Sequence, residues 1–200
     1  MQAILTQIFT EAEADEIYDY LLQKEIEYHK PYKRFNRTVK VPRGQASYTL
    51  SEKIHYNYGN TAGGSPVNEV MDESLRELTR RVNEATGNNY NTILMKVNKD
   101  GKDNIALHQD KETDWVPGTG FATVAFGFAR PFLIEQNDTR EKQRILHKKG
   151  LCIEMPFPMN QHYKHGITPC NTDQCRISLT FREVQLSGAR AEGSDPDGPL

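Results

Sequence analysis

A histidine and an aspartate, His108 and Asp110, are separated by one residue near the middle of the chain. On a β-strand, residues i and i+2 point to the same side, so this pair presents an imidazole and a carboxylate together. Both groups are common metal ligands, but they also form ordinary surface ion pairs. The pair alone therefore leaves two interpretations open.

Two later histidines, His162 and His165, offer a third ligand. Two histidines and one carboxylate on one face of a metal leave the other positions open. This is the arrangement of non-haem Fe(II) oxygenases, and it differs from a closed structural zinc site. His162 and His165 have opposite parity on a strand, so we expect only one of them to face the metal.

The run RISLTFR, residues 176–182, alternates between two kinds of side chain. The apolar set is Ile177, Leu179 and Phe181, and the polar set is Arg176, Ser178, Thr180 and Arg182. A buried arginine is costly unless it meets an anion, and its planar fork suits a carboxylate. A dicarboxylate co-substrate would account for both arginines. The alternative, an edge strand with solvated arginines, suits one arginine better than two.

A basic segment lies between His29 and Arg43, and it contains no acidic residue. Its cations are Lys30, Lys33, Arg34, Arg37, Lys40 and Arg43. Tyr32 and Phe35 are interleaved with them, a composition typical of a strand or loop that faces a nucleic-acid backbone. A solvated surface hairpin is the alternative.

Two helices and a series of strands must position these residues. Thr10 and Glu13 form a capping-box pattern, which predicts a helix over about 11–24. Ser65 and Pro66 are suited to begin a second helix, which we expect to end at Gly87. Its predicted buried stripe is Val67, Val70, Met71, Leu75, Leu78 and Val82.

From Tyr90 onward the pattern changes to short β-type runs separated by Gly, Pro, Asp and Asn. These runs are TILMKV, FATVAFGF, PFLIE, RILH, LCIEM and CRISLTFREV. Strands that follow helices predict an α+β, mainly β fold, in which an antiparallel barrel or jelly roll carries the helices on one face.

The composition indicates one soluble domain. The chain has 200 residues, a net charge of −2 and three cysteines, which excludes a globally basic protein and argues against a disulfide scaffold. No run approaches the ~18 apolar residues of a membrane span, and the N-terminus lacks the features of a signal peptide. We therefore expect an intracellular, monomeric protein with a domain over 1–185 and a flexible tail over 186–200.

The ordered motifs resemble a known family. The pattern G-x-D-x-I-x-x-H-x-D-x-E begins at Gly101, and PGTGFATVAFGFARPF, GLCIEMPFPMNQHYKHGI and RISLTFR follow it. Over roughly residues 35–184 this resembles the AlkB family of Fe(II)- and 2-oxoglutarate-dependent nucleic-acid dealkylating dioxygenases. The resemblance implies a double-stranded β-helix supported by N-terminal helices, and it implies Fe(II), 2-oxoglutarate and O2 as cofactor and co-substrates.

The resemblance also implies roles for individual residues. His108, Asp110 and His165 would hold iron. Arg176 would bind the distal carboxylate of 2-oxoglutarate, and Arg182 would lie near the end of the co-substrate that is close to the metal. The residues implied on the substrate side are Phe35, Arg43, Tyr56, Tyr58 and Glu112. Phe35 would fill the gap left by a flipped base, and the two tyrosines would stack on or bound that base.

One position departs from the family. Many members carry Asn-x-Tyr at the start of the core, where both side chains contact the co-substrate. This chain has Lys96 and Asn98 there, and strand parity still places both side chains on one face. An ammonium group facing a carboxylate is chemically reasonable, so we expect both residues to bind the co-substrate.

The implied activity is oxidative demethylation of N-alkylated bases, of the N1-methyladenine or N3-methylcytosine type, with release of formaldehyde. A base inside a duplex must be flipped out or be single-stranded already to reach the iron. Three alternatives stay open: an RNA N6-methyladenine demethylase, a dioxygenase of the same fold that acts on protein or a small molecule, and an inactive nucleic-acid-binding module. The sequence does not separate DNA from RNA.

Overall fold

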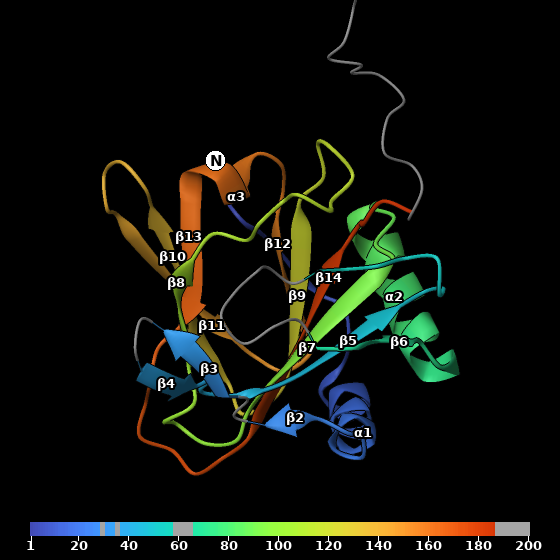
Figure 1. Cartoon of the computed structure of the whole chain (residues 1–200), viewed down its shortest axis with the longest axis horizontal. Helices are drawn as coiled ribbons and strands as arrows, with labels where there is room; N and C mark the ends of the chain where they lie inside the picture. The colour runs from blue at the N-terminus through green and yellow to red at the C-terminus, as the bar shows by residue number, and fades with distance from the viewer. Residues whose placement is uncertain (29–30, 35–36, 58–65, 187–200) are drawn as a thin grey trace, which may run out of the picture.

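The computed structural model describes residues 1–28, 31–34, 37–57 and 66–186. It consists of two β-sheets, three helices and a separate two-stranded hairpin (Figure 1). The helices are α1 (Glu11–Leu22), α2 (Glu73–Thr86) and the short α3 (Met159–His162). No helix within these ranges is long and apolar enough to cross a membrane.

The larger sheet has eight strands in the order β1-β12-β9-β14-β7-β5-β2, with β6 paired to β5. Its strands are β1 (Ile4–Gln7), β2 (Glu27–Tyr28), β5 (Gly44–Thr49), β6 (Asn68–Val70), β7 (Thr92–Asn98), β9 (Phe121–Gly127), β12 (Leu151–Met155) and β14 (Arg176–Arg182). All pairings in this sheet are antiparallel except that of β5 with β6.

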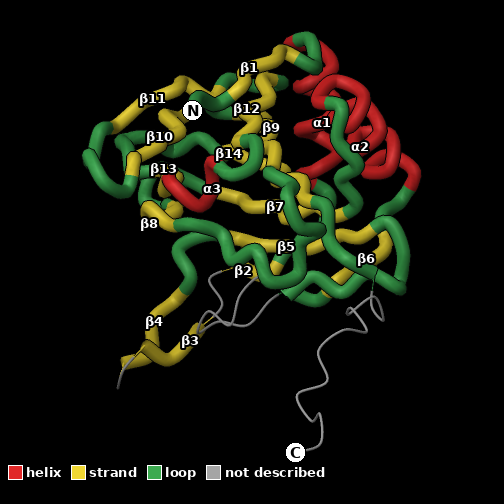
Figure 2. Tube along the Cα trace, turned by 90° about the horizontal axis from the view of Figure 1, so that it is seen from above, coloured by secondary structure: helices red, strands yellow, loops and turns green. Residues whose placement is uncertain are grey.

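The smaller sheet has four antiparallel strands in the order β11-β10-β13-β8. They are β8 (Ile105–His108), β10 (Arg130–Gln136), β11 (Lys142–His147) and β13 (Tyr163–Ile167). The hairpin consists of β3 (Pro31–Arg34) and β4 (Arg37–Lys40). It projects away from the body of the molecule (Figure 2).

Two hydrophobic clusters explain this layering. One joins α1 and α2 to one face of the larger sheet and includes Ile177, Leu179 and Phe181, the predicted apolar side of β14. The two helices lie side by side against that sheet (Figure 2). The other cluster joins residues of both sheets, among them Phe121 and Phe132. The predicted jelly roll with helices on one face is therefore confirmed.

The first predicted helix is confirmed, but the predicted start of the second is wrong. Thr10 and Glu13 form the expected capping box of α1. Helix α2 begins at Glu73, because the side chain of Asp72 accepts a hydrogen bond from Leu75 N at 3.0 Å. Ser65 lies outside the described residues, and Pro66 precedes β6 instead of a helix. The helix ends at Gly87, as predicted, in a left-handed conformation with φ 70°.

Strands β1 and β5 also occur before Tyr90, where the sequence pattern did not predict them. Strand β1 pairs with β12, so its partner is about 150 residues away. The fully buried strand β5 lies between β2 and β7 in the larger sheet. Both strands depend on distant partners, and short-range periodicity does not report such partners. The tail was predicted over 186–200; Leu186 forms a β-bridge with Ile54, and residues 187–200 lie outside the described residues.

Candidate metal and co-substrate site

Neighbouring strands of the smaller sheet bring the three predicted ligands together. His108 on β8 is directly opposite His165 on β13, and Asp110 follows β8 by two residues. One potential ligand atom from each of the three residues lies within 4.8 Å of the others. Asp110 and His165 are buried, and His108 is partly exposed. Within the described part of the chain, this is the one such group of metal-binding side chains.

The hydrogen bond made by His108 indicates that this cluster fits a cation. Its Nδ1 lies 2.8 Å from the carbonyl oxygen of Ala106, which can only accept, so Nδ1 carries a proton and Nε2 is the ring nitrogen that can bind a metal. Nε2 of His108 lies 3.2 Å from Asp110 Oδ1. Asp110 Oδ1 is also 4.0 Å from Nε2 of His165. Two imidazole nitrogens and one carboxylate oxygen that converge in this way are the donor set that suits Fe(II), so the residues fit this metal.

The other carboxylate oxygen of Asp110 accepts hydrogen bonds from Arg182. Arg182 donates from Nε to Asp110 Oδ2 at 3.1 Å, and its Nη2 makes a second, very short contact with the same oxygen. The guanidinium carbon lies 5.4 Å from the ring centre of Tyr56 and 5.6 Å from that of Trp115. Arg182 therefore orients the carboxylate and leaves Oδ1 directed at the metal position.

The electrostatics of the site keep the ligands in the form that binds metal. Burial by itself would raise the pKa of Asp110, but the charge of Arg182 lowers it well below its usual value. Burial lowers the pKa of His165 well below its usual value, although Asp110 opposes this shift. Asp110 is thus a carboxylate and His165 a neutral imidazole.

Of the two candidate histidines, the structure brings His165 and not His162 into this cluster. The argument from strand parity was wrong for His162, because that residue ends α3 and is exposed instead of lying on a strand. His165 is stacked on Phe132 at a centroid distance of 5.7 Å and an angle of 16°. This packing fixes the plane of the imidazole.

A small cavity adjoins the metal ligands between the two sheets. Its lining consists of Lys96, Ile105, Phe121, Thr123, Phe132, His165, Gly166, Ile167, Arg176, Ser178 and Thr180. Lys96 is 3% exposed and Arg176 is 1% exposed, so two buried cations line one enclosed space. The predicted polar face of β14 therefore points inward, towards the metal ligands.

Arg176 is surrounded by uncharged acceptors. Nη1 donates to Ser178 Oγ at 3.0 Å and to Asn98 Oδ1 at 3.4 Å, and Nη2 lies 3.0 Å from His147 Nδ1. Burial and the nearby Arg130 lower the pKa of Arg176 to about 9. A buried cation in this setting is stabilised by an anion. Asn98 contacts the arginine, and Lys96 is the other predicted co-substrate ligand on the same face of β7.

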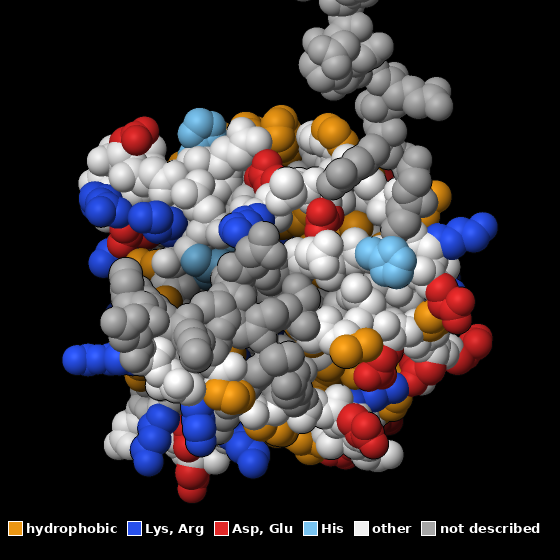
Figure 3. All heavy atoms as spheres, in the orientation of Figure 1, with side chains coloured by type: hydrophobic (Ala, Val, Ile, Leu, Met, Phe, Trp, Pro, Cys, Tyr) orange, Lys and Arg blue, Asp and Glu red, His pale blue; other side chains and the backbone are white. Residues whose placement is uncertain are grey.

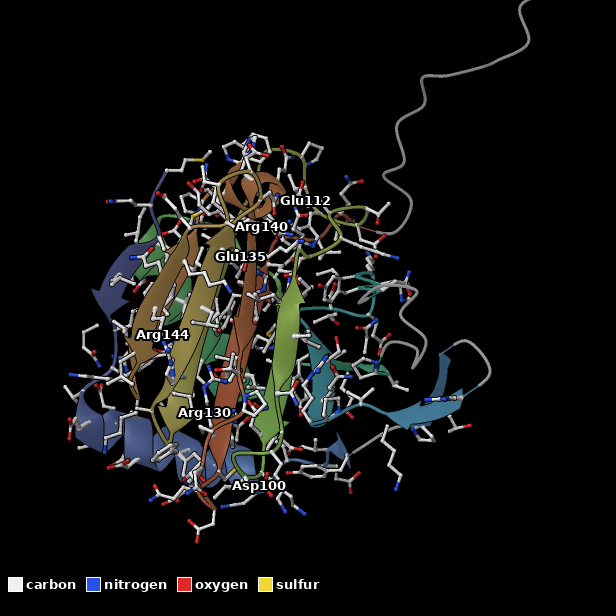
Figure 4. The ribbon with its side chains drawn as sticks, turned by 90° about the vertical axis from the view of Figure 1, so that its left-hand side faces the viewer. Asp100, Glu112, Arg130, Glu135, Arg140 and Arg144 are labelled. Atoms are coloured by element: carbon white, nitrogen blue, oxygen red, sulfur yellow. The ribbon has the colours of Figure 1, made fainter. Side chains whose placement is uncertain are left out.

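Asn160 of α3 holds the segment that carries the metal ligands. Its Oδ1 accepts from Asp110 N at 3.0 Å, and its Nδ2 donates to Asp110 O at 3.0 Å. The same Nδ2 donates to Glu112 Oε1 at 2.7 Å, and Gln161 donates to the other Glu112 oxygen at 2.9 Å. Glu112 lies near α3 at the upper end of the molecule in Figure 4. Sequence analysis missed Asn160, because a single Asn in a short turn gives no periodic signal.

The loop before β8 is held just as tightly. A Cβ on Gly101 would lie 1.9 Å from the carbonyl oxygen of Cys170, so only glycine fits there. Asp103 accepts from Lys99 N at 2.9 Å, and Arg130 donates to the Asp103 carbonyl at 2.9 Å. Arg130 lies at the lower part of the smaller sheet, beside this loop (Figure 4). The G-x-D part of the motif thus fixes how the chain enters β8.

The residues predicted on the substrate side are only partly placed. Phe35 and Tyr58 lie outside the described residues. Tyr56 is buried, and its ring lies beside the guanidinium of Arg182. Arg43 donates to Gln45 Oε1 and to the carbonyl oxygen of Asn104, both at 3.2 Å. These contacts hold the base of the hairpin against the loop that leads into β8.

Comparison with known proteins agrees with this geometry. A family model of the 2OG-Fe(II) oxygenase superfamily matches residues 2–182. DNA oxidative demethylase ALKBH2 of Homo sapiens is 32% identical over 195 residues, which covers 91% of this chain and 73% of that protein.

The chain belongs to the AlkB family. It is therefore an Fe(II)- and 2-oxoglutarate-dependent dioxygenase, and Fe(II), 2-oxoglutarate and O2 are its cofactor and co-substrates.

Other AlkB relatives are more distant. DNA oxidative demethylase ALKBH2 of Arabidopsis thaliana is 27% identical, covering 84% of this chain and 61% of that protein. Alpha-ketoglutarate-dependent dioxygenase alkB homolog 3 of Homo sapiens is 25% identical, covering 55% and 42%. Among solved structures, that of OsALKBH1 matches with a TM-score of 0.61 at 15% identity, covering 91% of this chain and 98% of that one. This last likeness concerns the fold alone.

Proposed function

We propose that this chain is a DNA dealkylase that removes N-methyl groups of the N1-methyladenine and N3-methylcytosine type. The observation that carries the proposal is the adjacency of two features. The cluster of His108, Asp110 and His165 adjoins an enclosed cavity, and that cavity contains the buried cations Lys96 and Arg176. A metal and a small dicarboxylate can therefore be bound side by side.

Bound together, Fe(II), 2-oxoglutarate and O2 supply the oxidant that hydroxylates the methyl carbon, after which formaldehyde leaves the base and succinate and CO2 remain. The protein places these groups. Arg176 would bind the distal carboxylate of the co-substrate, and Lys96 would contribute a second positive charge. Arg182 orients Asp110, and Asn160 holds the backbone that carries it. Phe121 and Phe132 exclude water from the cavity wall.

The charge distribution supports nucleic acid as the substrate. Lys and Arg side chains gather mainly along the left-hand edge and lower left of Figure 3, on the side where Figure 1 shows the β3–β4 hairpin. Arg37 and Lys40 of this hairpin are exposed. Its base is joined to the β8 entry loop, because Asn104 N donates to Pro42 O at 2.9 Å. Cations held at this position can bind the phosphates of a strand whose base enters the site.

DNA is the preferred polymer because the relatives with 32% identity bear the name DNA oxidative demethylase. We infer that Glu112, held beside Asp110 by α3, contacts the target base, and that Tyr56, Tyr58, Phe35 and Arg43 bound it. The intact ligand set argues against an inactive binding module.

The experiment is a demethylation assay with Fe(II) and 2-oxoglutarate on oligonucleotides that carry one methylated base. Matched single- and double-stranded DNA and RNA, with N1-methyladenine, N3-methylcytosine or N6-methyladenine, are compared by mass spectrometry and formaldehyde release. We expect turnover of the first two bases in DNA. Activity confined to N6-methyladenine in RNA, or succinate formation driven by a protein or a small molecule and by none of the oligonucleotides, would contradict the proposal.

The substitution Arg176→Lys tests whether this arginine binds the co-substrate or the nucleic acid. Lysine keeps the charge but loses the planar fork, so we expect the KM for 2-oxoglutarate to rise about tenfold or more. Binding of a methylated oligonucleotide should not change. An equal loss of both affinities would show that Arg176 faces phosphate.

A further inference from the structure

A second buried histidine, His147, lies outside the metal cluster. It ends β11 and is 0% exposed. Its Nε2 is 3.0 Å from the carbonyl oxygen of Leu151. A carbonyl oxygen can only accept, so Nε2 of His147 must carry a proton.

The other ring nitrogen faces the co-substrate arginine. Arg176 Nη2 is 3.0 Å from His147 Nδ1, and a guanidinium can only donate. Nδ1 therefore offers a lone pair, and the ring is neutral with its proton on Nε2. Burial and the charge of Arg176 lower the pKa of His147 well below its usual value, against the opposing effect of the backbone groups of Leu151 and Thr123, and this direction agrees with a neutral ring. Both hydrogen bonds use the same ring, so the ring has one orientation.

The partners of Arg176 share one property. His147 Nδ1, Ser178 Oγ and Asn98 Oδ1 are all neutral acceptors. They direct the guanidinium without neutralising it, whereas a carboxylate in any of these places would form an internal ion pair. The positive charge of Arg176 thus stays available to an incoming anion.

Packing connects His147 to the metal side of the cavity. The ring of Phe132 meets His147 edge-on, with a centroid distance of 5.8 Å and an angle of 82°. Phe132 also stacks on His165 and lines the cavity. A change in the orientation of the His147 ring would therefore disturb both Arg176 and this aromatic wall.

We propose that His147, as the neutral Nε2–H tautomer, is a positioning residue that orients Arg176 towards the distal carboxylate of the co-substrate. The inference rests on the proposed role of Arg176 in binding 2-oxoglutarate. His147 belongs to the other sheet and is 29 positions away from Arg176 in the sequence. Through Arg176 it determines the affinity for 2-oxoglutarate without contacting the co-substrate itself.

Two substitutions of His147 each keep one of its two hydrogen bonds and remove the other. In His147→Asn the side-chain oxygen can replace Nδ1 and still accept from Arg176. In His147→Gln the side-chain amide nitrogen can replace Nε2 and still donate to Leu151, but no acceptor remains at the Nδ1 position. Ile145→Val is the matched control, because Ile145 is buried on the same face of β11 and does not line the cavity.

The affinity for 2-oxoglutarate is measured by calorimetry with Mn(II) in place of iron and without O2, together with Tm. We expect His147→Gln to weaken binding about tenfold, the factor for one hydrogen bond to a charged group. His147→Asn should stay within about twofold of the parent, and Ile145→Val should lower Tm only. In turnover assays, His147→Gln should raise the KM for 2-oxoglutarate while kcat at saturation is retained.

Equal affinities for His147→Gln and the parent protein would overturn the inference and leave the proposed function standing. Equal losses in the Asn and Gln variants would also overturn it, because the role would then be structural. A parent protein that binds no 2-oxoglutarate would overturn both proposals. Nitrogen NMR of labelled histidine gives an independent test, in which a proton on Nδ1 of His147 would contradict the assignment.

Discussion

Asn160→Asp tests the view that α3 holds the metal ligands in place. The substitution changes one NH2 group to an oxygen and keeps the shape of the side chain. In the structure this group donates to Asp110 O at 3.0 Å and to Glu112 Oε1 at 2.7 Å, and Asn160 is 3% exposed. After the substitution, a carboxylate oxygen would take the place of this NH2 group and would face the carbonyl oxygen of Asp110 and Oε1 of Glu112.

The magnitude follows from these two contacts. The carbonyl of Asp110 would lose a buried partner, which costs about 1–3 kcal/mol. The donor to the Glu112 carboxylate would be lost as well, which costs about 1.5–3 kcal/mol, and like charges would face each other. Together these two losses predict that the metal-free protein loses about 2.5–6 kcal/mol of its free energy of unfolding. The affinity for Mn(II) should fall about 10- to 100-fold, as when groups that support metal ligands are changed.

The assays are denaturant unfolding of the metal-free protein and calorimetric titration with Mn(II). Gln161→Glu is the matched control, because it makes the same chemical change at an exposed neighbour that also contacts Glu112, at 2.9 Å. We expect this control to change stability by about 0.5 kcal/mol or less. If Asn160→Asp and Gln161→Glu behave alike in both assays, Asn160 does not position Asp110 and the reasoning is refuted.

Three further predictions concern the metal, the helices and the hairpin. His165→Ala should abolish turnover and weaken Mn(II) binding, whereas His162→Ala should retain both; the reverse result in metal titrations would reassign the ligand. Burial would raise the pKa of Asp72, but hydrogen bonds from Lys24, which follows α1, and from Tyr20 of α1 lower it to about 2. The stabilisation that Asp72 provides is therefore present above about pH 4 and is lost as pH falls towards 2. Asp72→Asn should therefore cost about 1 kcal/mol at neutral pH and flatten acid unfolding between pH 4 and 2, and an unchanged acid transition would argue against the pairing. Replacing Arg37 and Lys40 by Ala should reduce the slope of log K against log salt for oligonucleotide binding by about 1–2, and an unchanged slope would exclude these cations as phosphate contacts.

Local patterns in the sequence were sufficient for several parts of the site. Because side chains alternate between the two faces of a strand, the sequence predicted that Arg176 and Ser178 lie on the same side of β14. In the structure both side chains line the cavity. The capping box of α1 was also readable, because Thr10 and Glu13 are only three residues apart. Such features depend on neighbouring residues alone, so the sequence contains all the information that they need.

Tertiary structure alone decided which distant residues meet. The pairing of β1 with β12, the burial of β5 in the larger sheet and the late start of α2 depend on partners that no local period indicates. The same holds for the contacts that orient the site. Arg182 reaches Asp110 across 72 positions, and Asn160 reaches it across 50. His147 could be recognised as a partner of Arg176 only once the two sheets had closed around the cavity, because hydrogen bonds of a buried side chain are set by whatever the fold brings within about 3 Å of it.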